Sequence, residues 1–90
     1  MFEILYHDDV VAKDLPKIDV GWRQTIRQAI EAKLMTSPEI YGKPLRRSLK
    51  NYRKLRVGDY RVVFRIEKQT VKIFAIQHRS KVYATAPKRI

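Results

Sequence analysis

The stretch KLRVGDYRVVF, residues 54–64, carries positive charge where a sheet is expected to form. Strand-forming residues flank Gly58 and Asp59, a pair typical of a tight hairpin turn. Side chains alternate between the two faces of a strand. This alternation places four cations on one face of the predicted sheet: Lys54, Arg56, Arg61 and Arg65. Opposed like charges cost up to about 1 kcal/mol per pair, and a hydrated face normally mixes signs. We therefore favour an anion-binding face over a merely solvated one.

A second group of reactive side chains follows the last predicted strand, in QHRSKVY, residues 77–83. His78 can exchange a proton near neutral pH, and Arg79 adds a cation beside it. Tyr83 offers a ring on which an RNA base can stack, worth about 1–3 kcal/mol. The alternatives are a structural histidine and a tyrosine that covers the sheet edge.

Together these groups match the needs of RNA cleavage by the 2′-hydroxyl. A base removes the 2′ proton, cations hold the charge that develops on the phosphorane, and an acid protonates the leaving oxygen. Lys54 is the candidate base, because neighbouring cations disfavour the charged form of a lysine. No metal or other cofactor is expected, since Asp8 and Asp9 are better explained as a helix cap than as ligands.

Composition narrows the class of protein. Ninety residues predict a single domain over 1–90. The chain has no cysteine, which excludes disulfides, thiolate metal sites and cysteine catalysis. No apolar run approaches the roughly 20 residues of a membrane span, and no signal peptide opens the chain. We expect a cytoplasmic protein that has no membrane partner.

Charge is segregated along the chain, whose net charge is +11. Residues 1–40 contain five Lys/Arg and seven Asp/Glu, whereas residues 41–90 contain fifteen and two. Such asymmetry favours binding of a polyanion, nucleic acid above all, over a generic solvated surface or a membrane. Six cations, one of them Arg65 of the face described above, are predicted to bind RNA: Arg46, Arg47, Lys50, Arg53, Arg65 and Lys81.

The pattern of elements predicts an α+β fold. A strand at residues 2–6 precedes a helical turn in VVAKDL, which Pro16 stops. A helix over residues 20–35 follows, with Asp19 as its N-cap and Ser37-Pro38 at its end. Residues 36–50 are expected to form a loop. The remaining predicted strands are 53–57, 60–66 and 71–78.

This β-α-α-β-β-β order predicts a small four-stranded, mainly antiparallel sheet. Two N-terminal helices would pack on one of its faces, because a single layer cannot bury itself. The cations would then occupy the other face.

Two motifs carry a resemblance to a known family. LRVGDYRVVF followed by HRSKVY, after a helix ending in SP and a GKPL loop, resembles the RelE-type toxins of bacterial and archaeal toxin–antitoxin systems. The resemblance covers essentially the whole chain and places it in the RelE/ParE superfamily. It implies an mRNA interferase, an endoribonuclease that needs no metal and cleaves mRNA in the ribosomal A site. Its partners would be the ribosome, mRNA and a RelB-like cognate antitoxin that holds it inactive.

The resemblance also implies roles for single residues. The matching positions are Lys54, Arg61, Arg79 and Tyr83, and Arg56 matches a commonly basic position. We expect Lys54 as base, Arg61 and Arg56 as phosphorane stabilisers, Arg79 as acid or stabiliser, and Tyr83 as stacker. His78 is an alternative in either proton transfer, because the stretch before Arg79 is shorter than in some relatives. Some members also have a lysine where this chain has Tyr52, with Arg53 or Lys50 as alternatives.

Two other functions share this fold. The L-R-V-G-D-Y-R block also occurs in ParE-like inhibitors of DNA gyrase, which bind protein and do no chemistry. The H-R-x-x-V-Y ending argues against that alternative. The other function is that of a degenerate family member, which only binds its antitoxin or RNA.

Overall fold

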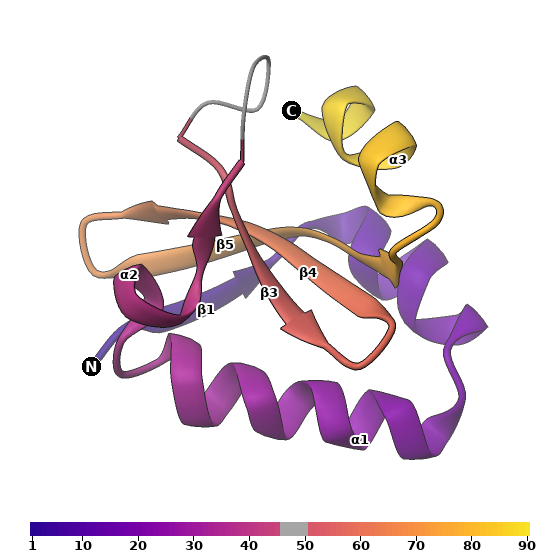
Figure 1. The fold of residues 1–90 in the computed structure, drawn as a ribbon, viewed down its shortest axis with the longest axis horizontal. Coiled ribbons are helices and arrows are strands. Elements are labelled where there is room, and N and C mark those ends of the chain that lie inside the picture. Colours follow the sequence, from indigo (N-terminus) through magenta and orange to yellow (C-terminus); the bar gives the residue numbers. More distant parts are fainter. Residues whose placement is uncertain (46–50) are drawn as a thin grey trace.

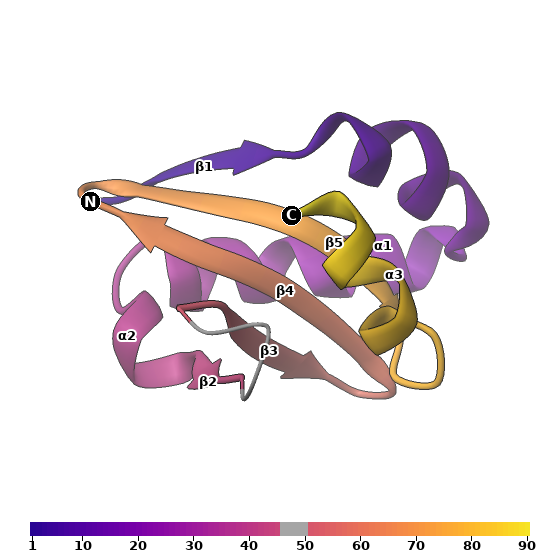
Figure 2. The same cartoon turned by 90° about the horizontal axis from the view of Figure 1, so that it is seen from above.

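A five-stranded sheet forms the centre of the computed structural model, which describes residues 1–45 and 51–90 (Figure 1). The strands are β1 (Glu3–Tyr6), β2 (Lys43–Pro44), β3 (Arg53–Val57), β4 (Tyr60–Glu67) and β5 (Thr70–His78). Their order is β1-β5-β4-β3-β2, visible from top to bottom in Figure 2. Among these described strands, only β1 pairs in parallel, with β5. The predicted α+β class and mainly antiparallel sheet are confirmed, but the count of four strands is wrong.

The extra strand is β2, which is only two residues long and contains Pro44. Lys43 pairs with Lys54, and Pro44 pairs with Arg53. Proline lacks a backbone N–H and is therefore confined to sheet edges. A loop was the natural prediction for this segment.

The helical elements are η1 (Val10–Asp14), η2 (Leu15–Lys17), α1 (Val20–Ala29), its continuation η3 (Ile30–Leu34), α2 (Pro38–Tyr41) and α3 (Val82–Arg89). Asp19 caps α1 as predicted, since its carboxylate accepts a hydrogen bond from Gly21 N at 3.0 Å. The predicted aspartate cap of the first helical turn is wrong. Asp9 makes no capping hydrogen bond there, and its own N–H donates to His7 Nδ1 at 3.0 Å.

The two faces of the sheet are covered by different helices. In Figure 1, α1 lies beneath the sheet and α3 lies above it. Beneath the sheet, Ile26, Ile30 and Leu34 are buried in one core with residues of β3, β4 and β5, including Phe64, the largest fully buried side chain among the described residues. Residues recurring at i, i+4 and i+8 form one helix face, so the α1 stripe was predictable.

The helix α3 was not predicted, and it covers part of the face that was expected to be open. Val82 and Ala86 of α3 are buried there with Tyr52, Val63 and Ala75. A β-bulge assists this packing: Val63 opposes Ala75 while Phe64 opposes Ile73, so Phe74 has no partner on β4. A bulge changes the facing of the residues beside it, and Phe74 joins Ala75 on the α3 side. No helix among the described residues is long and apolar enough to cross a membrane.

Candidate active site

The predicted cations lie on the face that α3 partly covers. Lys54 pairs in register with Val63, which is buried against α3, and Arg56 pairs with Arg61. Residues directly opposite in a sheet share a face. Lys54, Arg56 and Arg61 therefore point to the α3 side, as alternation predicts. Among the described strands, three pairs of like charges oppose one another directly: Arg56 and Arg61, Lys43 and Lys54, and Arg65 and Lys72.

Arg61 is held by the hairpin turn. Its side chain is only 8% exposed, and Nη1 donates to Gly58 O and Tyr60 O, both at 2.9 Å. Among residues 1–45 and 51–90, neither Nε nor Nη2 of Arg61 has a hydrogen-bond partner. A guanidinium can bind an oxyanion through two parallel N–H groups. The turn therefore orients a cation whose remaining edge can meet a phosphate.

Tyr83 comes to this face from α3. Lys54 Nζ lies 5.6 Å from the centre of the Tyr83 ring, and the tyrosine is 40% exposed. At this distance the ring attracts the ammonium group. Lys54 and Tyr83 are thus brought together, as their predicted roles in one site require.

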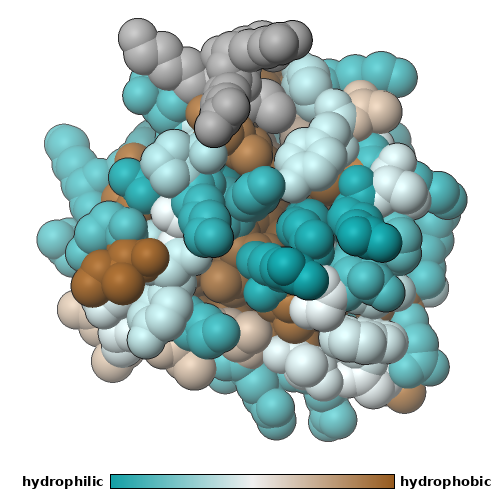
Figure 3. All heavy atoms as spheres, in the orientation of Figure 1, coloured by the Kyte–Doolittle hydropathy of each residue, from teal (hydrophilic) through white to brown (hydrophobic). Residues whose placement is uncertain are grey.

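A hollow of about 270 Å³ runs along the edge of β3 beside this group. The edge is open because β2 pairs only with Arg53 and Lys54. The hollow is lined by Lys33, Tyr41, Lys43, Lys54, Leu55, Arg56 and Arg61. Figure 3 shows hydrophilic side chains gathered over this side of the molecule. Lys33, Tyr41 and Lys43 were not predicted, because three separate elements supply them and no spacing in the sequence links them.

Arg79 lies beside the same hairpin turn. Its backbone N–H donates to Asp59 O at 2.8 Å, and its Nε is 4.0 Å from Asp59 Oδ1. Both side chains of this ion pair are exposed, so it contributes little to stability. The end of β5 therefore places Arg79 near the turn that orients Arg61.

His78 lies on the opposite face. It pairs in register with Tyr60, and the two ring centres are 6.1 Å apart. Tyr60 in turn packs on Trp22 of α1 at 5.4 Å. His78 Nδ1 is 2.9 Å from Ser80 Oγ and accepts from Ser80 N at 3.2 Å. The structure does not bring His78 together with Lys54 and Arg61.

Two cations predicted to bind RNA make structural contacts. Arg53 Nη1 donates to Glu39 O at 3.3 Å and to Gly42 O at 2.9 Å, which ties β3 to the α2–β2 connection. Arg65 pairs with Glu67, donates to Tyr52 OH at 3.0 Å and stacks on the rings of Tyr52 and Phe74. Arg65 therefore lies apart from the pair formed by Arg56 and Arg61.

Tyr52 stands where some relatives are expected to have a lysine. It is buried, and its ring meets Phe74 edge-on at 5.2 Å. It belongs to the core under α3 and offers no charge to a ligand. Lys81 is exposed at the start of α3. The predicted residues Arg46, Arg47 and Lys50 lie outside the described residues.

No group of three His, Cys, Asp or Glu side chains that could hold a metal ion is found in the part of the chain that the structure describes. The predicted metal independence remains a prediction.

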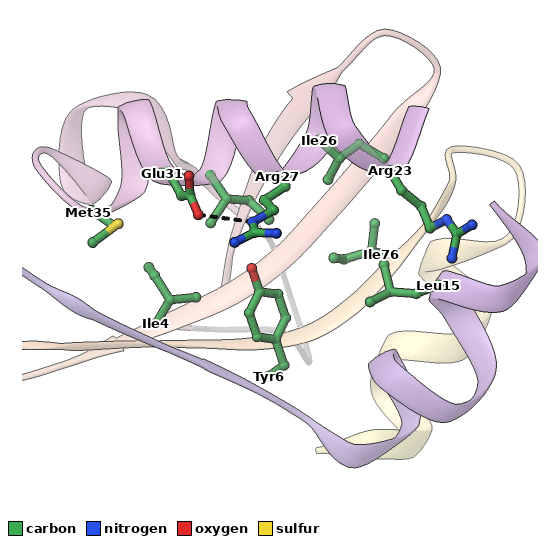
Figure 4. Close-up of a pocket in the computed structure, with 10 residues that line it drawn as sticks. Ile4, Tyr6, Leu15, Arg23, Ile26, Arg27, Glu31, Met35 and Ile76 are labelled. Carbon is green, nitrogen blue, oxygen red and sulfur yellow. Dashed lines mark hydrogen bonds and ion pairs between the residues drawn. The ribbon is translucent and has the colours of Figure 1, made fainter. Parts of the chain in front are cut away.

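A separate apolar groove of about 490 Å³ lies between β1 and α1 (Figure 4). Ile4, Leu15, Ile26, Ile30 and Met35 form most of its surface, with Arg23 and the ion-paired Arg27 and Glu31 along α1. Tyr6 projects from β1 toward this pair, and burial raises the pKa of its phenol. The groove lies on the α1 side of the sheet, so it is distinct from the cationic hollow.

Comparisons with known proteins identify the family. Residues 5–83 match the family model described as the ParE toxin of type II toxin–antitoxin systems, parDE. The chain is 34% identical to Toxin RelE of Mycobacterium tuberculosis over 80 residues, 87% of this chain and 82% of that protein. It resembles the toxin–antitoxin complex RelBE2 from the same organism with a TM-score of 0.80 and 28% identity, over 88% of this chain and 92% of that one.

A mutant of the E. coli toxin RelE in its free state shares the fold, with a TM-score of 0.74 at 20% identity, over 99% of this chain and 97% of that one. A likeness at that identity concerns the fold alone, whereas the family match spans most of the chain. This chain belongs to the RelE/ParE family of toxins of type II toxin–antitoxin systems.

Proposed function

We propose that this toxin is a ribosome-dependent mRNA endonuclease that cleaves mRNA in the ribosomal A site and so inhibits translation. The observation that supports it best is the convergence of Lys54, Arg61 and Tyr83 on one face beside the hairpin turn. A base and an oriented anion-binding group are two of the three parts that 2′-hydroxyl attack requires, and the ring can hold an RNA base beside them. As a factor acting on translating ribosomes, it would work in the cytoplasm.

In this reaction the 2′ oxygen forms a bond to phosphorus and the bond from phosphorus to the 5′ oxygen breaks. Lys54, acting as the base, takes the 2′ proton. The edge of Arg61 formed by Nε and Nη2 holds the phosphorane oxygens, assisted by Arg56. The products are a 2′,3′-cyclic phosphate and a 5′-hydroxyl. The reaction needs no metal, so cleavage should persist in EDTA under conditions that keep ribosomes intact.

The leaving 5′ oxygen must gain a proton. Arginine keeps its proton in proteins, so we assign Arg79 to charge stabilisation. His78 lies on the α1 side and can donate only if the RNA bends around the end of β5. His78 is therefore the proton donor of the two if the RNA takes that path, and a water molecule donates the proton if it does not.

Primer extension on an mRNA translated in a cell extract tests the proposal. Wild-type toxin should produce new 5′ ends only when ribosomes are present, and Lys54→Ala and Arg61→Ala should abolish most of them. Lys13→Ala is a matched control, because it removes an exposed lysine of η1 that makes only a long contact with Asp9. Identical cleavage by wild type and Arg61→Ala would refute the assignment.

The ParE name of the matching family model favours a second candidate, inhibition of DNA gyrase without chemistry. That function predicts loss of supercoiling by purified gyrase while mRNA stays intact. A toxin that neither cleaves mRNA nor inhibits gyrase, and whose induction leaves growth unchanged, would be the degenerate member.

We also infer that a cognate, RelB-like antitoxin binds this toxin. Related toxins were solved with partners, as RelBE2 of M. tuberculosis and as YoeB–YefM of Staphylococcus aureus. The groove between β1 and α1 is apolar with arginines along it, which fits an acidic amphipathic helix. Met35→Glu should weaken antitoxin binding and spare cleavage. Val20→Glu, an exposed position outside the groove, is its control.

A further inference from the structure

Asp14 connects three parts of the fold that are distant in sequence. Its carboxylate is 1% exposed and accepts four hydrogen bonds. Ile76 N and Gln77 Nε2 donate from β5, both at 2.9 Å. Arg89 donates through Nη1 at 2.7 Å and Nη2 at 2.9 Å. This bidentate pair joins η1 and β5 to the last residue of α3.

Like Asp14, Arg89 is buried and held by several polar contacts. Its side chain is 7% exposed, and Nη1 also donates to Phe74 O at 3.0 Å. Asp9 lies 3.7 Å from Nε and adds a second negative charge. A buried carboxylate left without its cation is costly, so the ion pair is strongly favoured once α3 is in place.

The position of α3 depends on such contacts. The helix has eight residues and contains Pro87, and isolated helices of this length are marginal in water. Val82, Ala86 and Arg89 recur at i, i+4 and i+7 and so form the face that meets the sheet. Tyr83 is the next residue around the helix, beside Lys54. Rotation or lifting of α3 would move Tyr83 away from Lys54.

We propose that Asp14 and Arg89 are positioning residues, whose ion pair fixes α3 on the sheet and thereby holds the Tyr83 ring beside Lys54. Neither residue touches the RNA. The consequence for catalysis rests on the proposed function, whereas the consequence for Tyr83 does not.

A double-mutant cycle on single-turnover cleavage separates this role from general stabilisation. Arg89→Gln should lower the rate about tenfold when Tyr83 is present, a loss within the range expected for one stacking ring. In a Tyr83→Ala background the same change should have an effect of less than about twofold, since residues that act through one another are not additive. Equal losses in the two backgrounds would overturn the proposal. Lys72→Gln, which breaks a partly exposed ion pair with Glu67, is the matched control.

Two measurements need no activity. Amide hydrogen exchange should accelerate over residues 82–89 in Arg89→Gln and stay unchanged over residues 20–34. The ring-proton NMR shifts of Tyr83 should move toward those of free tyrosine. If both stay as in wild type, the proposal fails. If wild type cleaves no RNA while both change, the proposed function fails and the positioning role stands.

If Arg89→Gln does not fold, Asp14→Asn replaces it as the test variant. The amide oxygen of asparagine can still accept the hydrogen bond from Ile76 N, while the negative charge is lost. It should reproduce the exchange and shift changes of Arg89→Gln. Arg89→Lys keeps the charge but not the bidentate geometry, and it should restore part of the cleavage rate. If Arg89→Lys restores none of the cleavage rate and the Tyr83 ring-proton shifts of Asp14→Asn equal those of wild type, the ion pair has no positioning role.

Discussion

The ammonium group of Lys54 and the ring of Tyr83 lie 5.6 Å apart, although one belongs to β3 and the other to α3. The cation comes from a strand that alternation predicts, and the ring comes from a helix that the sequence analysis did not foresee. Their proximity makes α3 part of the candidate site and not merely a cover for the sheet. Substitutions at Tyr83 therefore test whether the face described above binds RNA.

Tyr83→Ala should reduce single-turnover cleavage by about 5- to 150-fold, the equivalent of the roughly 1–3 kcal/mol that stacking on an aromatic ring provides. Tyr83→Phe keeps the ring and should retain most of the activity. Primer extension with ribosomes measures both. An equal loss in the two variants would mean that the hydroxyl matters, and that Tyr83 is a proton donor instead of a stacking residue.

Arg79 and His78 are neighbours in sequence, but the structure places them differently. Arg79 lies beside the hairpin turn, while His78 packs on Tyr60 on the α1 side. Arg79→Ala should therefore lower the cleavage rate much more than His78→Gln does. The reverse order would show that the RNA passes around the end of β5 and reaches His78.

Arg61 should matter for stability as well as for activity. Its Nη1 donates to two carbonyl oxygens of the hairpin, at Gly58 and Tyr60, and the net contribution of a hydrogen bond to stability is about 0.5–1.5 kcal/mol. Arg61→Ala should lower the free energy of unfolding by roughly 1–3 kcal/mol in urea titrations. Arg56→Ala removes an exposed arginine at the paired position and should change it by less than about 0.5 kcal/mol. Equal effects would show that these hydrogen bonds do not stabilise the turn.

Alternation alone predicted the orientation of the cations on β3 and β4. The same rule applied to β5 would have separated His78 from Lys54, because His78 opposes Tyr60 in register. Register depends on how two strands pair, so it could not be predicted from residues 77–83 alone. The prediction therefore identified the cations of the hairpin that share a face. It also grouped His78 with them, although His78 lies on the opposite face.

Features that depend on distant contacts were missed. The α3 helix has Val82, Ala86 and Arg89 at helical spacing, but it is short and contains Pro87, which weakens any local signal. Asp14 looked like one polar residue in a helical turn, and its four hydrogen bonds come from β5 and α3. Only the folded chain reveals that pairing, since more than half of the sequence separates Asp14 from its partners.

Glu67 should make the free energy of unfolding depend on pH in acidic solution. Hydrogen bonds from Lys72 and Arg65 hold the pKa of Glu67 below its ordinary value of 4.5. A carboxylate whose pKa is lowered by folding stabilises the protein above its unfolded pKa, and this contribution is lost as pH falls through the folded pKa. Urea midpoints of wild type should therefore fall below pH 4.5 more steeply than those of Glu67→Gln. Parallel curves would show that these contacts do not persist in solution.

The hairpin turn leaves no room for a side chain at Gly58. Gly58 has φ +59°, and a Cβ there would lie 2.5 Å from Trp22 Cη2. A left-handed conformation costs a residue with a Cβ roughly 1 kcal/mol, and overpacking adds about 1–3 kcal/mol. Gly58→Ala should thus be destabilising by roughly 2–4 kcal/mol in urea unfolding. In a Trp22→Ala background the steric part should vanish and the loss should shrink to roughly 1 kcal/mol. Gly58 O also accepts a hydrogen bond from Arg61. If the turn orients Arg61, Gly58→Ala should therefore lower the cleavage rate in both backgrounds. An undiminished rate in the double variant would show that the turn does not orient this arginine.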